Sequence, residues 1–420
     1  MFSGRSSTHP SIILRVSRHR PHLTRSGNTR AFLNARPVAL RIGGAAVLFL
    51  YKILLVTTGL LVVGFFTGKA WAKGKTGREG EVLVFEDRFK EFDLNIWRHE
   101  ITLSGGGHWQ FEHSTNNRSN SWVEDGILYL RPTLTADTMG EDCVTGAISC
   151  TLDVWGLTPA DQCTSNAFFG CSRTSNSGQR EAINPVQSAR ISSVNSFDFT
   201  FGRVEVEAKL PRGDWLWPAI WMLPSVNSYG SWPSSGEIDI MESRGNAPGY
   251  CPNASCAGGN DVISSSLHWG PFTSLNRYSM TTGDFKLPVG RSFDEDFHTF
   301  GLYWSESGLY TYVDTEDQEV LRVDFNDTSF WERGGFQDLE GVVNPWKGRG
   351  NSAPFDQGFY LIMNVAVGGV GGFFPDGDDG DESKKPWKNS DGDAPLKFWE
   401  AREDWLPTWK ENDAALQVTH

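Results

Sequence analysis

The stretch SSGEIDIMES, Ser234–Ser243, places three carboxylates in a run of strand-forming residues. Alternate residues of a strand share a face, so Glu237 and Asp239 point one way while the isoleucines between them point the other way. On a regular strand Glu242 would enter the apolar layer, where an unpaired carboxylate is very costly. A β-bulge at Ile240–Met241 would restore the phase, so we expect all three acids on one face.

The spacing of the two glutamates predicts a reaction type. With the bulge they occupy in effect positions i and i+4, so their Cα atoms lie roughly 13 Å apart. Side chains that lean together bring the carboxyl groups near the ~5–5.5 Å of a retaining glycosidase, rather than the ~6.5–9.5 Å of an inverting one. One carboxylate would attack the anomeric carbon and the other would protonate the leaving oxygen, with Asp239 helping to separate the two titrations. The alternative is a solvated edge strand whose acids block aggregation.

The rest of the chain has the period of strands. Alternating or apolar runs occur at 126–134, 202–210, 298–325 and 358–369, separated by Gly, Asp, Ser and Pro. The 17 Trp, 27 Phe and 45 Gly suit an aromatic-rich β protein. We expect one all-β domain of two packed antiparallel sheets, a sandwich or barrel.

Two segments interrupt this pattern. Thr133–Pro185 holds four of the six cysteines and is predicted to be a disulfide-stapled excursion. Close neighbours are expected to pair, Cys251 with Cys256 for instance. The segment 373–395 is acidic and turn-rich; it is either a solvated loop or a structural Ca²⁺ site, and we expect no other metal or cofactor. Glycosylation sequons begin at Asn117, Asn253 and Asn326.

The N-terminal part differs from the body in charge. Residues 1–72 hold ten Lys and Arg and no acid. The formal net charge of the whole chain is −13, so that of residues 73–420 is −23. An acidic body argues against nucleic acid as a partner. The apolar run at 45–66 is long enough to span a bilayer, and Ala70-Trp71-Ala72 resembles a signal-peptidase site. We expect 73–420 to be secreted, or to be the extracellular domain of a type II membrane protein anchored through 45–66. A mitochondrial transit peptide is a third interpretation.

The carboxylate motif carries a family resemblance. GEIDIMES resembles the signature of glycoside hydrolase family 16 in its laminarinase-type form. Further blocks resemble that family in order: GHWQFE (107–112), FTFGRVEVEAKLP (199–211), WPAIWMLP (217–224), SSSLHWG (264–270), FHTFGLYW (297–304) and FYLIMNVAVGG (359–369). The ending FWEAREDWLPTW (398–409) resembles the invertebrate glucan-recognition and 1,3-β-glucanase group. The resemblance implies a β-jelly-roll sandwich over 73–420 with substrate across a concave cleft.

The resemblance also implies roles. Glu237 would be the nucleophile, Asp239 its assistant and Glu242 the acid/base. Trp217 and Trp221 match aromatic cleft positions and His268 matches a histidine near the leaving group, although by the residues alone Trp221 equally fits the core and a lone histidine is ordinarily structural. Further sugar contacts are expected at Arg190, Asn364, Trp109, Trp215 and Trp232.

Two functions from different classes follow. The first is an extracellular endo-1,3-β-glucan hydrolase, expected to be a monomer whose partner is β-1,3-glucan. The second is a binding protein of the same fold that recognises microbial β-glucan in immunity. Proteins that only bind typically lack one or more of the carboxylates, and this chain keeps all three. Transglycosylation uses the same covalent intermediate with a sugar as acceptor, and the sequence does not weigh acceptor preference.

Overall fold

The computed structural model describes residues 13–17, 81–253, 257–378 and 385–420. Residues 13–16 and 84–420 belong to one compact unit, and the second unit, 17–83, is described only at Ser17 and 81–83. The expected signal or anchor helix at 45–66 lies outside the described residues. Within the described ranges no helix combines the length and apolar character needed to cross a bilayer.

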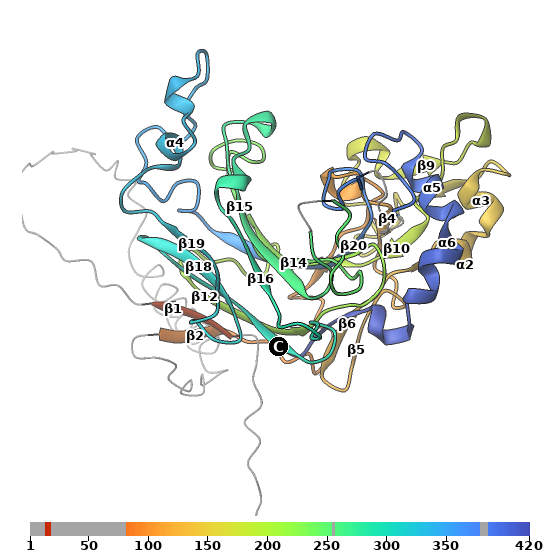
Figure 1. Ribbon diagram of the computed structural model, residues 1–420, viewed down its shortest axis with the longest axis horizontal. Coiled ribbons are helices and arrows are strands. Elements are labelled where there is room, and N and C mark those ends of the chain that lie inside the picture. The colour runs from red at the N-terminus through yellow and green to blue at the C-terminus, as the bar shows by residue number, and fades with distance from the viewer. Residues whose placement is uncertain (1–12, 18–80, 254–256, 379–384) are drawn as a thin grey trace, which may run out of the picture. The chain divides into compact units, whose positions relative to one another are not determined.

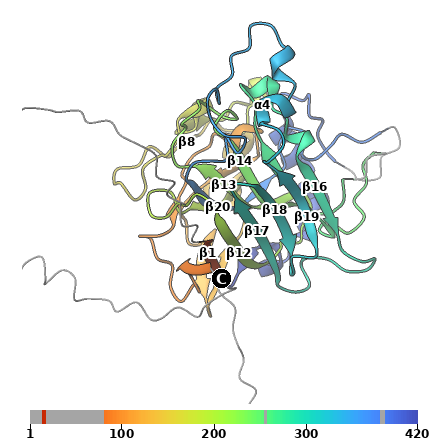
Figure 2. The same ribbon diagram turned by 90° about the vertical axis from the view of Figure 1, so that its left-hand side faces the viewer.

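Two large sheets form the unit (Figures 1 and 2). The first has the strand order β19 (Glu319–Asp324), β18 (Gly308–Val313), β17 (His298–Ser305), β12 (Gly202–Lys209), β21 (Leu416–Val418), β6 (Ile127–Leu130) and β5 (Ser121–Glu124), with β1 (Ile13–Ser17) also paired to β12. The second has the order β16 (Thr282–Lys286), β15 (Val262–His268), β14 (Glu237–Ser243), β13 (Leu216–Pro224), β20 (Phe359–Val367), β11 (Arg190–Ser192) and β3 (Arg98–His99). Neighbouring strands along both orders are antiparallel.

Smaller elements complete the unit. A third sheet contains β4 (Glu112–Ser114), β10 (Val186–Ser188) and β7 (Thr133–Leu134), and β10 runs parallel to β4, a pairing that the sequence did not predict. A two-stranded sheet joins β8 (Thr151–Asp153) to β9 (Ser172–Thr174), and β2 spans Glu81–Phe85. The helices are short: α2 (Ala136–Met139), α3 (Glu141–Thr145), α4 (Phe330–Arg333), α5 (Ala394–Glu400) and α6 (Arg402–Trp405).

The core lies between the two large sheets. Strand alternation sends Ile238 of β14 and Leu267 of β15 into the same buried cluster as Val206 of β12 and Phe300 of β17. Burying each such side chain is worth roughly 1.5–3 kcal/mol, so this shared apolar layer holds the sheets together. The predicted all-β sandwich of two antiparallel sheets is confirmed.

The predicted bulge lies in β14. Between Asp239 and Glu242 the register with β15 shifts, so that two β14 residues lie opposite one residue of β15. The backbone carbonyl of Ile240 accepts a hydrogen bond from Ser265 Oγ at 2.7 Å, and Ser265 Oγ accepts one from Thr311 Oγ1 of the other sheet at 2.8 Å. These buried hydroxyls connect the bulge to the sheet behind it.

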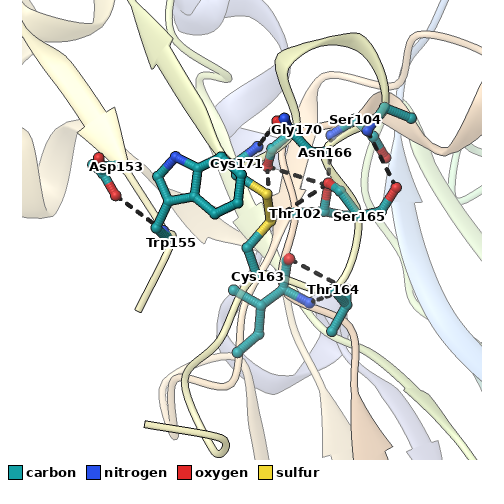
Figure 3. Close-up of a disulfide and its surroundings, with 12 residues drawn as sticks. Thr102, Ser104, Asp153, Trp155, Cys163, Thr164, Ser165, Asn166, Gly170 and Cys171 are labelled. Carbon is teal, nitrogen blue, oxygen red and sulfur yellow. Dashed lines mark hydrogen bonds between the residues drawn. A yellow bond between two sulfur atoms is a disulfide. The ribbon is translucent and has the colours of Figure 1, made fainter. Parts of the chain in front are cut away.

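The cysteine-rich excursion folds as α2, α3, β8 and β9. Cys143 pairs with Cys150, as expected for close neighbours. Cys163 pairs with Cys171 in the same way (Figure 3). Figure 1 shows these elements beside the C-terminal helices α5 and α6, and the Arg402 guanidinium bonds Glu141 of α3 at 2.9 Å. The expected Cys251–Cys256 pair stays a prediction because residue 256 lies outside the described residues.

The acidic segment contains a cation supplied by the chain itself. Lys385 Nζ donates to Phe374 O, Asp376 Oδ1 and Asn389 Oδ1 at 2.7–2.8 Å. The Lys385 ammonium lies next to Asp376 in this acidic segment, and the choice between a solvated loop and a structural Ca²⁺ site stays a prediction. Residues 379–384 lie outside the described residues.

Candidate active site

The bulge turns all three acids of β14 to one face. Asp239 lies opposite Trp221 of β13, and Glu242 lies opposite Ala219. Trp221 and Ala219 are two positions apart on β13 and therefore point the same way. Directly paired residues also point the same way, so Asp239 and Glu242 share a face, and Glu237, two positions before Asp239, shares it too. We call this surface the carboxylate face.

The same register adds expected site residues from three more strands. Ala219 lies opposite Asn364 of β20, and Asn364 lies opposite Arg190 of β11. On the other side, His268 of β15 lies opposite Glu237. Five neighbouring strands therefore bring residues more than 170 positions apart in sequence onto the carboxylate face.

Glu237 lies among hydrogen-bond donors. Trp232 Nε1 donates to Glu237 Oε2 at 3.0 Å, and His268 Nε2 lies 3.7 Å from Oε1. Burial, followed by the charge of Asp239, raises the pKa of Glu237 to about 8. The side chain remains 16% exposed, so a substrate can reach it.

Asp239 is the most deeply buried of the three acids, at 3% exposure. Its Oδ2 lies 3.2 Å from His268 Nε2, but the contact is not aligned as a hydrogen bond and Oδ2 has no other partner among the described residues. Burial and the charge of Glu242 raise the pKa of Asp239 well above its usual range. Asp239 therefore favours the protonated form.

Glu242 is held by an indole. Trp217 Nε1 donates to Glu242 Oε1 at 2.9 Å. The Trp217 ring stacks on Phe373 with 3.8 Å between centroids, and the Arg244 guanidinium covers Phe373 and donates to its carbonyl. Burial raises the pKa of Glu242, while His268, Trp217 and Arg244 oppose that rise by favouring the ionised form. Trp217 is therefore a hydrogen-bond donor here, with one ring face already covered.

Asn276 fixes the tautomer of His268. Asn276 Oδ1 accepts from the backbone N–H groups of Trp269 and Tyr278 at 3.3 and 3.2 Å. The amide nitrogen must then face His268, and Nδ2 lies 2.7 Å from Nδ1. An amide nitrogen only donates, so His268 Nδ1 accepts and the proton of the neutral ring lies on Nε2, toward the carboxylates. The ring also stacks on Tyr278, with 5.0 Å between centroids.

One group of side chains in the described residues has the spacing of a metal site. A ligand atom from each of Glu237, Asp239 and His268 lies within 4.8 Å of the others. A metal would need the Nε2 lone pair, whereas Asn276 directs an N–H to that position. The arrangement therefore favours donation of a hydrogen bond over coordination of a cation.

Three further expected contacts form a second cluster on the carboxylate face. Trp221 Nε1 donates to Asn364 Oδ1 at 2.7 Å, and the Arg190 guanidinium lies 4.5 Å from the Trp221 ring centroid. Arg190 also pairs with Glu100 at 2.9 Å. Trp221 is half-buried, so it belongs to the surface of this face and not to the core between the sheets.

Two tryptophans behave differently from the rest. Trp215 is 2% exposed and packs against Tyr250, Phe374 and Trp387, so the expectation that it extends the cleft is wrong. Its φ of 70° lies outside strand geometry, one residue before β13 begins, so the alternation that places Trp217 does not apply to it. Trp109 is 51% exposed, packs beside Phe168 and lines a cavity whose wall contains none of the three acids.

Several residues of the site were not identified from the sequence. Asn276, Tyr278, Phe373 and His108 each contact a predicted site residue, and the charge of Arg244 lowers the pKa of Glu242. Arg244 directly follows the carboxylate motif, and that position was the one available signal. The others lie in loops, where no periodicity shows which side chains meet.

Comparison with known proteins identifies the family. The sequence model for glycosyl hydrolases family 16 matches residues 170–334. The chain is 47% identical to the Beta-1,3-glucan-binding protein of Penaeus monodon, over 80% of this chain and 88% of that protein. It is 31% identical to a Glucan endo-1,3-beta-glucosidase of Cryptopygus antarcticus, over 69% of this chain and 81% of that protein.

Other relatives are longer, and the chain spans 63% of two of them. Among solved structures, the laminarinase from Rhodothermus marinus is 24% identical with a TM-score of 0.45, over 80% of this chain and 94% of that one. The strength and extent of the sequence matches show that the chain belongs to glycosyl hydrolase family 16.

Proposed function

We propose that the protein is an endo-1,3-β-glucanase that works by a retaining double displacement. The observation that carries the proposal is the bulge of β14, which brings Glu237, Asp239 and Glu242 to one face. Each glutamate there accepts an indole N–H, from Trp232 and Trp217 respectively. Two carboxyl groups flanking one glycosidic bond are what both glycosidase routes require, and the expected separation favours the retaining one.

In the first half-reaction Glu237 attacks the anomeric carbon while the bond to the leaving oxygen breaks and Glu242 gives that oxygen its proton. In the second, Glu242 takes a proton from water, whose oxygen attacks the anomeric carbon and releases Glu237. Asp239 keeps its own proton more readily than an ordinary carboxyl group does, so it adds little negative charge beside Glu237 when Glu237 gives up its proton to react. The Nε2–H of His268 adds a second donor toward the same charge.

A second function has its own support. The 47% identical relative from Penaeus monodon is named a glucan-binding protein, so recognition of β-1,3-glucan with little or no hydrolysis is the competing proposal. Both functions share the ligand, and they differ in whether the acids complete a turnover. Transglycosylation is a variant of the first function, in which a sugar hydroxyl replaces water as the acceptor.

We place the protein outside the cytosol as part of the proposal. Two disulfides in the described residues fit an oxidising compartment. The proposed organisation is a basic segment with a signal or anchor helix over 1–72, followed by one family 16 domain over 73–420, as a monomer.

The deciding experiment incubates the full chain with laminarin, lichenan and a 1,4-linked glucan, and sizes the products. An endo-acting enzyme releases mid-length oligosaccharides from laminarin, and Glu237→Gln abolishes this release while retaining binding. Binding of laminarin without products from the unaltered chain would establish the recognition function instead. If the unaltered chain neither binds laminarin nor releases products from it, both proposed functions are excluded.

A further inference from the structure

A cavity of about 310 Å³ has none of the three acids in its wall. Its wall comes from four segments: the chain before β4, the cysteine-rich excursion, Val370 after β20, and the residues at the start of α5. The residues that carry the argument are Trp109, Gln110, Arg173, Ala182, Asn184 and Asp391. The volume lies at the small end of ligand sites, which run from ~300 to ~1,000 Å³, and so suits one or two sugar rings.

Trp109 of the cavity wall and its neighbour Phe168 are exposed aromatic residues held at a cost in backbone energy. Trp109 packs against Phe168 with 4.8 Å between centroids, and both rings are more than half exposed. Their φ angles are 54° and 52°, in the left-handed region that costs non-glycine residues of order 1–3 kcal/mol. Backbone strain that holds apolar rings in water does not stabilise the fold. We therefore take these exposed rings as a sign that a ligand packs against them.

The strained loop is held by covalent and hydrogen bonds. The Cys163–Cys171 disulfide closes the loop that carries Phe168, and Thr102 Oγ1 donates to the Ser165 carbonyl at 2.7 Å (Figure 3). Arg173 Nη2 donates to the Phe168 carbonyl at 3.2 Å. The two rings therefore form a fixed surface, and little conformational entropy would be lost on binding.

Polar groups in the wall match sugar hydroxyls. Arg173 uses three of its five N–H groups on partners in the described chain, namely Asn184, Leu103 and Phe168, and so retains donors for a ligand. Asp391 also lines the cavity; its Oδ2 accepts from the Lys388 N–H at 2.7 Å and pairs with Lys397 at 2.9 Å, so Oδ1 is the carboxylate oxygen left for a ligand. An indole face beside a planar donor and a planar acceptor suits a neutral pyranose, whose rings have apolar faces and hydroxyl edges.

The cavity is linked to the carboxylate face through adjacent aromatic side chains. Glu242 is hydrogen-bonded to Trp217, the His108 ring lies 5.8 Å from the Trp217 ring, and Trp109 follows His108 in sequence. We propose that this cavity binds glucosyl residues of the same glucan chain at a distance from the bond to be cleaved. The proposal rests on the proposed glucan ligand and holds for both an enzyme and a recognition protein. Trp109 is already an expected sugar contact, and the proposal adds the cavity beside it, with Arg173, Asn184 and Asp391 in its wall.

The test measures binding by calorimetry in the full chain with Glu237→Gln, which prevents turnover. Trp109→Ala removes the exposed ring, and Ala182→Trp fills the cavity from its partly exposed edge. Trp155→Ala is the matched control. Trp155 is 51% exposed, as Trp109 is, and it lies in the cysteine-rich excursion with Ala182, but it does not line the cavity. Ligands are laminari-oligosaccharides of increasing length.

We expect the parent's affinity to rise with length until the cavity is filled. Trp109→Ala and Ala182→Trp should each bind the longest oligosaccharide about tenfold more weakly, and Trp155→Ala should match the parent. Parent-like affinity in Ala182→Trp would overturn the cavity proposal and leave the glucan ligand intact. A parent that binds no glucan at any length would overturn both. Thermal unfolding checks that each variant is folded. If Trp109→Ala proves to be unfolded, the binding result for Ala182→Trp alone decides the proposal.

Discussion

Replacing Glu237 with glutamine should stabilise the protein while it abolishes cleavage. Burial and Asp239 raise the pKa of Glu237 to about 8, from about 4.5 in an unfolded chain. Between these two values the folded state binds more protons than the unfolded state, so the free energy of unfolding falls as pH rises. Glutamine cannot ionise, and it retains an oxygen to accept the Trp232 N–H.

The size of the stability change follows from how far the pH lies above the pKa of glutamate in the unfolded chain. Each pH unit above about 4.5 costs about 1.36 kcal/mol until pH reaches about 8. At pH 7 the ionisable side chain therefore costs roughly 3 kcal/mol, and at pH 5 under about 1 kcal/mol. Glu237→Gln should gain about these amounts relative to the parent.

Urea unfolding of both proteins at pH 5 and pH 7 measures the difference. Glu340→Gln, at an exposed carboxylate, is the control and should change the free energy of unfolding little at either pH. A variant that is no more stable than the parent at pH 7, or whose gain does not grow with pH, would refute the account of a proton held by burial.

Three further outcomes are expected. Trp217→Phe keeps the stacked ring but removes the N–H that favours ionised Glu242, a charge-assisted hydrogen bond worth ~1.5–3 kcal/mol. The proton affinity of Glu242 should rise tenfold or more, so the alkaline limb of the kcat/KM profile should move to higher pH by about one unit or more. An unmoved limb would show that this indole does not set the acid. Asn276→Asp offers His268 Nδ1 an acceptor, so ¹⁵N NMR of the ring should show Nδ1 gain a proton and kcat should fall; an Nδ1 still unprotonated would contradict the tautomer assignment. NMR of the first-formed product from laminarin should show the retained anomer, and an inverted product would contradict the spacing of the two glutamates.

Much of the site could be predicted by counting along one strand. The phase conflict between Glu237 and Glu242 is visible in the sequence, and the bulge at Ile240–Met241 is its simplest resolution. The same counting does not separate Trp215 from Trp217, because the positive φ that turns Trp215 into the core depends on packing against distant aromatic residues.

Loop contacts were beyond such counting. Asn276 reaches His268 only because the turn after β15 brings its amide between two backbone N–H groups and the imidazole. Trp217 was expected as a platform for sugar, yet Phe373 arrives from a remote loop and covers one face of the ring. Sequence periodicity describes regular strands, and these contacts come from the connections between them.

The hydroxyl bridge behind the bulge has an evolutionary consequence. Thr311 and Ser265 are buried, and they hold the carbonyl of Ile240 in the position that turns Glu242 outward. If the protein is the proposed hydrolase, a homologue with alanine at Ser265 or valine at Thr311 would keep every acid of the motif but lose the hydrogen bonds behind the bulge. Such a protein would bind glucan without cleaving it. Surveys that sort this family into enzymes and receptors by intact carboxylates alone would misplace such proteins, and the pair behind the sheet should be read together with the acids.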